Sequence, residues 1–240
     1  MRYVASVSFG KDSLAMLLLI LGHKLPLDEV VFYDTGMEFN SIYHIRDQVQ
    51  NILNSSNVTF TELHPKMDFE YMMFEKPVKH RDGTTGFDYS WCGGLCRWGT
   101  RQKINEINKY CADAIQYVGI AADEMHRMGK EKSDYKRFPL IEYGMTEDEC
   151  LSYCRSKGFK WIEDGAHGPI DLYSILDRVS CWCCCNKNLK ELRNIYYYLP
   201  EYWNRLECLQ RKTSRPMKGI GKSVFDLGKR FELECRTWGK

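Results

Sequence analysis

Short apolar runs alternate with segments of helical periodicity through the first half of the chain. The strand-like runs are Tyr3–Val7, Glu29–Tyr33, Val58–Leu63 and Ala114–Ala121, and the helical segments are Ser13–Leu21 and Phe39–Leu53. An alternation of strands and helices is typical of a parallel sheet with helices on both faces. The pattern therefore predicts an α/β fold with a doubly wound, Rossmann-like parallel sheet.

The pattern changes after residue 140. Thr146 and Glu149 have the spacing of a capping box, which predicts a helix from there to about Lys157. A glycine-rich segment follows, and Pro200 predicts the start of a further helix. We therefore expect an α/β domain over residues 1–140, with an insertion over 75–98, and a helical, basic and cysteine-rich region over 141–240 packed against it.

The turn after the first predicted strand has the composition of an anion site. It reads Ser8-Phe-Gly-Lys-Asp-Ser13, and a helix begins at once. Backbone N–H groups and the positive end of a helix dipole then surround one small volume. The serine hydroxyls and Lys11 add donors, and Gly10 lets the backbone approach closely. The common nucleoside-triphosphatase loop has Ser or Thr after its lysine, whereas Asp12 stands here, so we predict a phosphate site of another type.

Two more polar turns follow predicted strands, at Asp34-Thr-Gly36 and at Gly119–Glu124. In open parallel sheets, ligands bind beyond the carboxyl ends of the strands, so these turns and the first are expected on one edge. Together they favour a nucleotide-binding domain. Because Mg²⁺ prefers carboxylate and phosphate oxygens, Asp12 or Asp34 is a candidate ligand for a magnesium ion.

Eleven cysteines are present, an odd number, and two groups stand out. They read Trp91-Cys-Gly-Gly-Leu-Cys96 and Ser180-Cys-Trp-Cys-Cys-Cys-Asn186. Two distant pairs can supply four sulfurs to zinc or to a [4Fe–4S] cluster. The candidate ligands are Cys92, Cys96, Cys181 and Cys184, with Cys183 and Cys185 open as alternatives to Cys184. Cysteine is also a common core residue, which suits the isolated Cys111, Cys150, Cys154 and Cys208.

No stretch is long enough to cross a membrane, and Leu14–Leu21 lacks the flanks of a signal peptide. We therefore expect a cytoplasmic protein with no membrane partner. The formal net charge is only +2, but Lys187–Arg230 holds eleven basic and four acidic residues, interleaved with aromatics such as Tyr202 and Trp203. That segment is a candidate surface for tRNA or DNA, or alternatively a solvated helix face with buried aromatics.

Four segments match a known family in order. Ser8-Phe-Gly-Lys-Asp-Ser13 resembles the loop S-[GF]-G-x-D-S, and Asp34-Thr-Gly-Met-Glu-Phe39 is similar to T-G-x-x-F. Gly119-Ile-Ala-Ala-Asp-Glu-Met-His-Arg127 resembles G-x-R-x-x-E-S-x-R, and Phe138-Pro-Leu-Ile-Glu-Tyr143 resembles the segment that begins P-[LI]-x-x-W. Over roughly residues 1–185 the chain resembles the PP-loop ATP pyrophosphatases and the phosphoadenylyl-sulfate (PAPS) reductase family, within the adenine nucleotide α-hydrolase group.

The resemblance implies an adenine nucleotide as ligand, either ATP or PAPS or adenylyl sulfate. The residues implied in binding it are Ser8, Phe9, Gly10, Lys11, Asp12, Ser13, Asp34, Thr35, Gly36 and Gly119. The implied catalytic residues are Lys11, Asp12 and Arg127. Arg127 is chosen because the arginine expected earlier in the third motif is Ala121 here. The reductases carry a nucleophilic cysteine in a C-terminal E-C-G-L-H, of which this chain shares only the Glu-Cys that ends at Cys235.

Three functions fit these features. The first is ATP-dependent adenylation of a substrate with release of pyrophosphate, coupled to sulfur transfer to a small molecule or a nucleic acid, with a sulfur donor protein as partner. The second is a PAPS or adenylyl-sulfate reductase that forms sulfite. The third is a nucleic-acid-binding module without catalysis. The intact Lys-Asp-Ser of the loop favours the first.

Overall fold

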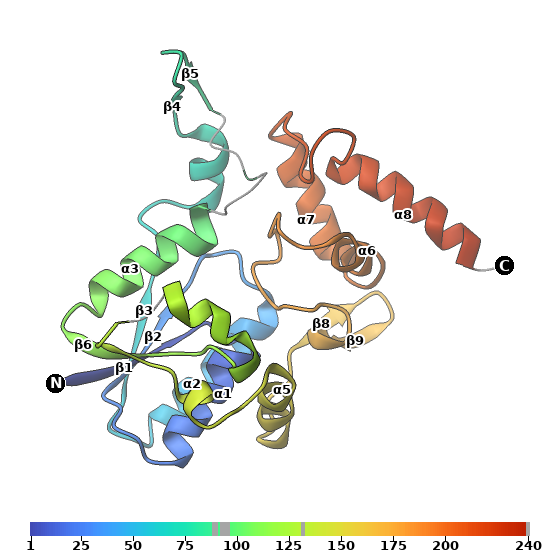
Figure 1. Ribbon diagram of the computed structural model, residues 1–240. Helices are drawn as coiled ribbons and strands as arrows, with labels where there is room; N and C mark the ends of the chain where they lie inside the picture. Colours follow the sequence, from blue (N-terminus) through green and yellow to red (C-terminus); the bar gives the residue numbers. More distant parts are fainter. Residues whose placement is uncertain (88–90, 92–96, 131–132, 239–240) are drawn as a thin grey trace.

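A computed structural model describes residues 1–87, 91, 97–130 and 133–238 of the chain (Figure 1). Its centre is a five-stranded sheet in the order β3-β2-β1-β6-β7, in which every neighbouring pair is parallel. The strands are β1 (Arg2–Val7), β2 (Glu29–Tyr33), β3 (Thr59–Leu63), β6 (Ala114–Val118) and β7 (Lys136–Arg137). The chain adds β2 and β3 on one side of β1 and then β6 and β7 on the other. The predicted doubly wound α/β fold is therefore confirmed.

Alternate residues of the strands face two different layers. Val4 and Val31 pack with α3 (Lys103–Tyr110) on one face of the sheet. Their neighbours in the strands, such as Ala5 and Phe32, belong to the larger core with α1 (Lys11–Gly22) and α2 (Asn40–Leu53) on the other face. Because side chains alternate along a strand, β1 and β2 must be apolar at nearly every position to serve both layers.

Helix α1 lies between the sheet and a further layer of chain. It contacts α4 (Pro139–Glu142) and α5 (Glu147–Ser156), and its apolar residues from Leu14 to Leu17 are fully buried. A helix covered on several sides needs apolar residues around most of its circumference, which accounts for the long apolar run. The capping box that the sequence predicts at the start of α5 is present, with the Thr146 side chain accepting from the backbone N–H of Glu149.

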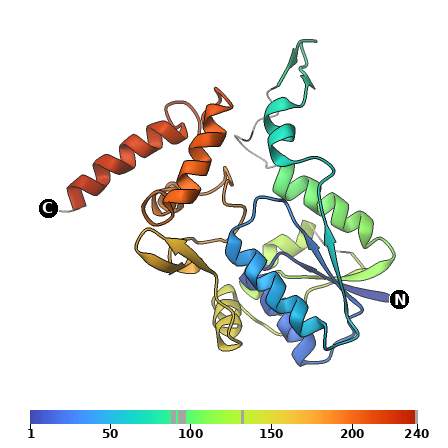
Figure 2. The same cartoon turned by 180° about the vertical axis from the view of Figure 1, so that it is seen from behind.

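The C-terminal part is helical, as expected. It comprises η4 (Leu172–Ser174), α6 (Leu189–Tyr198), α7 (Pro200–Arg211) and α8 (Val224–Trp238), and Pro200 opens α7 as predicted. Figures 1 and 2 show α6, α7 and α8 beside the sheet rather than over it, with the end of α8 leading away from the sheet. In the described part of the chain, no helix combines the length and the apolar character that crossing a membrane requires.

Some elements differ from the sequence-based expectation. Strand β6 ends at Val118 rather than Ala121, because the chain turns at Gly119 into the 3₁₀ segment η3 (Ala122–Lys130). The glycine-rich segment contains an antiparallel hairpin of β8 (Ile162–Gly165) and β9 (Gly168–Asp171). Within the insertion predicted over 75–98, the structure describes the short hairpin of β4 (Val78–Lys79) and β5 (Thr85–Gly86). The π-helical turns η1 (Tyr71–Glu75) and η2 (Arg97–Gln102) lie at its two ends.

Candidate nucleotide site

The loop between β1 and α1 is held in an uncommon conformation. Phe9 has a backbone φ angle of +58°, which residues other than glycine rarely adopt. Its ring is buried against Phe32, with ring centroids 5.0 Å apart, and its carbonyl accepts a hydrogen bond of 2.7 Å from Trp161 Nε1. Burial of the ring and this hydrogen bond fix the loop even though the backbone angle is unfavourable.

The serine hydroxyls and a tyrosine complete the loop. The hydroxyl oxygens of Ser8 and Ser13 are 3.1 Å apart, and Ser13 Oγ donates to the carbonyl of Gly10 at 3.2 Å. The backbone N–H of Lys11 donates to Tyr173 Oη at 2.8 Å. The loop thus depends on Trp161 and Tyr173, which are far from it in the sequence.

The Lys11 ammonium lies between two carboxylates. It is buried and forms ion pairs with Glu147, at the start of α5, and with Asp12 at 3.4 Å. Burial by itself would lower the pKa of Lys11, but the hydrogen bond to Glu147 and the charge of Asp12 outweigh it and raise this pKa. For Asp12, burial and the charge of Glu147 raise the pKa despite the opposing effect of Lys11. Lys11 is therefore firmly protonated in the folded protein.

A second set of charges continues from this pair. The buried carboxylate of Glu124 forms ion pairs with Arg127 and, at 2.5 Å, with Arg178. Arg178 also lies 3.9 Å from Glu147. Charges of alternating sign thus run from Arg127 to Lys11, and they position both of the cations that the sequence implies in phosphate chemistry.

A cavity of about 440 Å³ opens at the end of β1 and β6. It is lined by Ser8, Ser13, Gly119 and Arg127, and by three further basic side chains, Lys103, His126 and Lys136. Strand order reverses between β1 and β6, which is the place where open α/β sheets bind ligands. The basic side chains favour an anionic ligand there.

Gly119 lies unusually close to the loop. A Cβ atom at this position would be 2.8 Å from Ser13 Cα and 3.0 Å from Ser13 N. The end of β6 therefore packs directly on the first turn of α1, and a side chain at Gly119 would separate them.

The motif at the end of β2 lines a different cavity. Asp34, Thr35 and Gly36 lie in a cavity of about 810 Å³, which Trp182 and Arg205 also line. Asp34 Oδ1 accepts hydrogen bonds from the N–H of Gly36 at 2.8 Å and from Tyr43 Oη at 2.9 Å. Among the predicted nucleotide-binding residues, the structure thus brings together Ser8, Ser13 and Gly119 in one cavity and the Asp34–Gly36 turn in another.

The second cysteine group packs on this same turn. Cys181 Sγ lies 3.4 Å from Thr35 Oγ1, and the N–H of Cys184 donates to the carbonyl of Cys181 at 3.0 Å. Burial, together with the charge of Glu38, raises the pKa of the Cys181 thiol. A tight turn therefore connects the two cysteines that the spacing singles out.

Cys92 and Cys96 lie outside the described residues, but the tryptophans on either side of them are described. Trp91 Nε1 donates to the carbonyl of Cys183 at 2.6 Å, and Trp98 Nε1 donates to the carbonyl of Thr35 at 3.2 Å. Both indoles are buried. The residues that flank the first cysteine group are thus attached to the second group and to the turn beside it.

The isolated cysteines fall into two kinds. Cys111, Cys150 and Cys154 are buried, as expected of core residues, and burial raises the pKa of the Cys111 thiol to about 11. Cys208 is exposed, so its assignment to the core is wrong. Its position on the outer side of α7 beside the larger cavity accounts for the difference. Position 235 lies in α8, whose end leads away from the sheet (Figure 1).

The aromatics of the basic C-terminal segment are mostly internal. Tyr202 and Trp203 are buried, and Tyr196 packs edge-on against Trp203 with ring centroids 5.1 Å apart. Tyr197 is exposed, at 38 %. Tyr202 and Trp203 are therefore part of the core between the helices and are not available for stacking on bases.

Comparison with known proteins agrees with this geometry. Residues 2–160 match the model of the phosphoadenosine phosphosulfate reductase domain, which covers the sheet, the loop and α5. The chain belongs to the PAPS reductase family. This membership supports a nucleotide-binding enzyme, and it agrees with the resemblance drawn from the motifs.

A curated relative is similar to this member of the PAPS reductase family over most of its length. It is the uncharacterized protein MJ0066 of Methanocaldococcus jannaschii, with 25 % identity over 226 residues. The match covers 87 % of this chain and 41 % of the relative, so the chain spans about two-fifths of that protein.

Several site residues were not among those predicted from the sequence. Glu147 holds the Lys11 ammonium, Tyr173 accepts from its backbone, and Lys103 and Lys136 line the cavity. Glu147 lies next to Thr146, whose capping signal marks the start of a helix but does not indicate what that helix packs against. For Tyr173 and the lysines, no local sequence pattern gives a signal.

Proposed function

We propose that the protein binds ATP at the Ser8–Ser13 loop and adenylates a substrate oxygen with release of pyrophosphate, coupled to sulfur transfer. The observation that carries this proposal is the cavity at the end of β1 and β6. It is lined by the loop serines and by four basic side chains, Lys103, His126, Arg127 and Lys136. Such a set suits a ligand with several negative charges, and the family is one that acts on adenine nucleotides.

The chain's own residues would act mainly by stabilising charge. In adenylation, a substrate oxygen attacks the α-phosphorus of ATP, the α–β bridging bond breaks, and the electron pair leaves with pyrophosphate. The hydroxyls of Ser8 and Ser13 and the guanidinium of Arg127, which line the cavity, would bind the pyrophosphate oxygens on which charge develops. Lys11 would support this charge from its pair with Glu147. Asp12, beside Lys11, is the residue we assign to a magnesium ion.

The cysteines fit a metal centre near this site. The turn from Cys181 to Cys184, and the attachment of Trp91 to Cys183, support a centre held by Cys181 and Cys184 with Cys92 and Cys96. Such a centre, as zinc or a [4Fe–4S] cluster, would supply structural support or a place for sulfur to bind. The absorption spectrum and metal content of anaerobically purified protein distinguish zinc from iron.

The reductase remains the second candidate, because the family model is that of PAPS reductase and the loop has the phenylalanine form at Phe9. Figure 1 shows the C-terminal end of α8 leading away from the sheet and from α1, and this end of the chain shares only Glu-Cys with the reductase motif. Nucleic acid and a sulfur donor protein are proposed partners, for which the exposed basic residues of the C-terminal helices provide a surface. If that surface binds RNA, the affinity falls steeply as salt rises.

The decisive experiment compares two nucleotides. Purified protein is incubated with ATP and Mg²⁺, or with adenylyl sulfate and a thiol reductant, and pyrophosphate and sulfite are measured. With no other acceptor added, water takes the place of the substrate oxygen, so we expect pyrophosphate and AMP from ATP. Arg127→Ala should be at least tenfold slower, and Arg230→Ala, at an exposed arginine of α8, should be unchanged. Sulfite from adenylyl sulfate, with no pyrophosphate from ATP, would refute adenylation and establish the reductase.

A further inference from the structure

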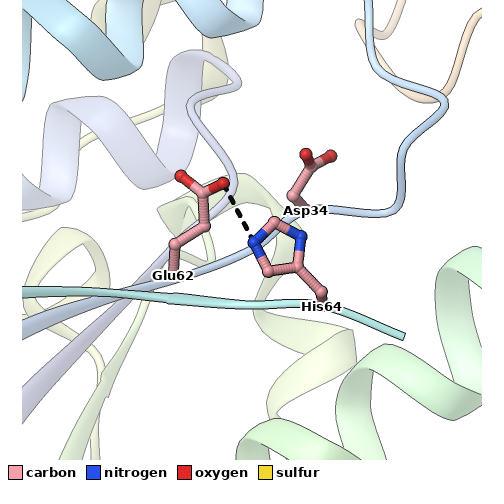
Figure 3. Close-up of side chains that lie close together, drawn as sticks. All are labelled: Asp34, Glu62 and His64. Carbon is pink, nitrogen blue, oxygen red and sulfur yellow. Dashed lines mark ion pairs between the residues drawn. The ribbon is translucent and has the colours of Figure 1, made fainter. Parts of the chain in front are cut away.

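Three side chains that commonly bind metals meet at the ends of β2 and β3 (Figure 3). They are Asp34, Glu62 and His64, and one possible ligand atom of each lies within 4.8 Å of those of the other two. The backbone explains the meeting. Phe32 pairs with Glu62 in the parallel ladder, and the N–H of Asp34 donates to the carbonyl of Leu63 at 2.9 Å. Residues two apart on a strand share a face, so Asp34 and His64, each two positions beyond this pair, lie beside each other on the face that carries Glu62.

The side chains are held in place by neighbouring groups. The hydrogen bonds that Gly36 and Tyr43 donate to Asp34 both go to Oδ1, so among the described residues no hydrogen bond occupies Oδ2. One oxygen of Glu62 pairs with Arg46 at 3.3 Å, and the other lies 3.3 Å from His64 Nε2. Oriented ligands of this kind are typical of metal sites, because the supporting hydrogen bonds reduce the entropy lost on binding. A metal ion would take the place of the contact between Glu62 and His64.

The charge balance at this place is negative. Arg46 is the cation in contact with Glu62, and it is shared with Asp47 at 2.8 Å. Asp34 is itself only 9 % exposed. Two carboxylates beside one shared arginine would be stabilised by a divalent cation.

The ligand types indicate the class of metal. One imidazole nitrogen and two carboxylate oxygens suit first-row transition metals such as Mn²⁺ and Zn²⁺, and they do not suit a sulfur-ligated cluster. Asp34 and His64 also line the 810 Å³ cavity, as do Arg205 and Lys212. Three protein ligands beside an open cavity leave coordination positions free for an oxygen ligand.

We propose that Asp34, Glu62 and His64 bind one divalent transition-metal ion, separate from the loop at Ser8–Ser13 and from the cysteine group. Its open positions face the 810 Å³ cavity. The proposal is independent of the adenylation reaction, since the cavity that contains the loop is a different one.

Electron paramagnetic resonance of Mn²⁺ tests the proposal on the full chain, without nucleotide. Mn²⁺ is the suitable probe because cysteine thiolates prefer softer ions. We expect one bound Mn²⁺ per chain. His64→Ala and Asp34→Asn should each weaken binding at least tenfold, whereas Asp47→Asn should retain the affinity, since Asp47 lies beside Arg46 outside the three ligands.

A second measurement links binding to the folded state. Saturating Mn²⁺ should raise the midpoint of thermal unfolding of the wild type and of Asp47→Asn, but not that of His64→Ala. His64 has a largely exposed side chain, so its loss leaves the fold intact, which circular dichroism checks. Equal Mn²⁺ affinity in the wild type and in His64→Ala would overturn the proposal. Equal weakening by Asp47→Asn would also overturn it, because the binding would then reflect only the local negative field.

Discussion

Replacing Gly119 by alanine places a methyl group against the backbone at the end of the Ser8–Ser13 loop. The added Cβ would lie 2.8 Å from Ser13 Cα, 3.0 Å from Ser13 N and 3.2 Å from Asp12 C. All three are main-chain atoms at the start of α1, where Leu14 N donates to the carbonyl of Gly10 at 3.0 Å. They cannot rotate away as a side chain would, so either the turn after β6 or the first turn of α1 must move.

The size of the effect follows from this contact. Insertion of a methyl group into a closely packed place costs about 1–3 kcal/mol of unfolding free energy. For a chain of this size that corresponds to a fall of roughly 2–4 °C in the unfolding midpoint for each kcal/mol. Because the displaced segments carry the cavity lining at Ser8 and Ser13, the affinity for an ATP analogue should fall at least tenfold.

Thermal unfolding and calorimetric titration with a non-hydrolysable ATP analogue measure the two effects. Gly22→Ala is the matched control, because in the described part of the chain its Cβ would meet only Tyr153 Oη at 3.6 Å, an ordinary contact. This change should leave binding unchanged and stability equal or slightly higher, by about 0.5–1 kcal/mol, as alanine favours a helix. If Gly119→Ala unfolds and binds like the wild type, the close approach of β6 to the loop does not exist in solution.

Two further predictions concern ionisable groups. Glu147→Gln should lower the unfolding free energy at pH 7 by about 1–3 kcal/mol, because it leaves the buried Lys11 ammonium with a weaker partner. Burial opposes ionisation of Glu147, but Lys11 holds the pKa of this carboxyl below its ordinary 4.5. The stabilisation is therefore present above pH 4.5 and is lost as the pH falls through the lowered value, so denaturant titrations should converge there; a constant difference from pH 7 to pH 3 would contradict the ion pair. At pH 8 a thiol reagent should modify the exposed Cys208 rapidly and Cys111, with its pKa near 11, only after unfolding. Peptide mapping by mass spectrometry identifies the labelled positions, Cys208→Ser serves as the control, and rapid labelling of Cys111 in the native protein would show that its burial is wrong.

The central strands of the sheet can be predicted from the sequence, but the edge strand β7 cannot. In Glu29–Tyr33, four consecutive apolar residues follow the glutamate and are buried by both faces of the sheet, so the pattern predicts the strand to the residue. Strand β7 consists of Lys136 and Arg137, which carry no apolar signal and form a strand only through pairing with β6. Tertiary context decides such short polar strands, and local propensity does not.

The candidate site divides in the same way. The Ser8–Ser13 loop can be recognised from the sequence because the family motif that it resembles has particular residues at fixed spacing in one segment. Glu147 and Tyr173 meet Lys11 across 136 and 162 positions of sequence, and a tyrosine or a glutamate at a helix start has many ordinary uses. Their contacts follow from how α5 and η4 pack on α1, which periodicity alone does not specify.

The dependence of the loop on Trp161 and Tyr173 limits how this protein could be recombined with others. The match to the family model ends at residue 160, immediately before Trp161, whose indole donates to the Phe9 carbonyl. A chimera joined at that point would receive neither this donor nor the hydroxyl that accepts from the Lys11 backbone. A junction after η4, beyond Ser174, keeps both. The smallest segment that could be exchanged as a module is therefore longer than the region that the family shares.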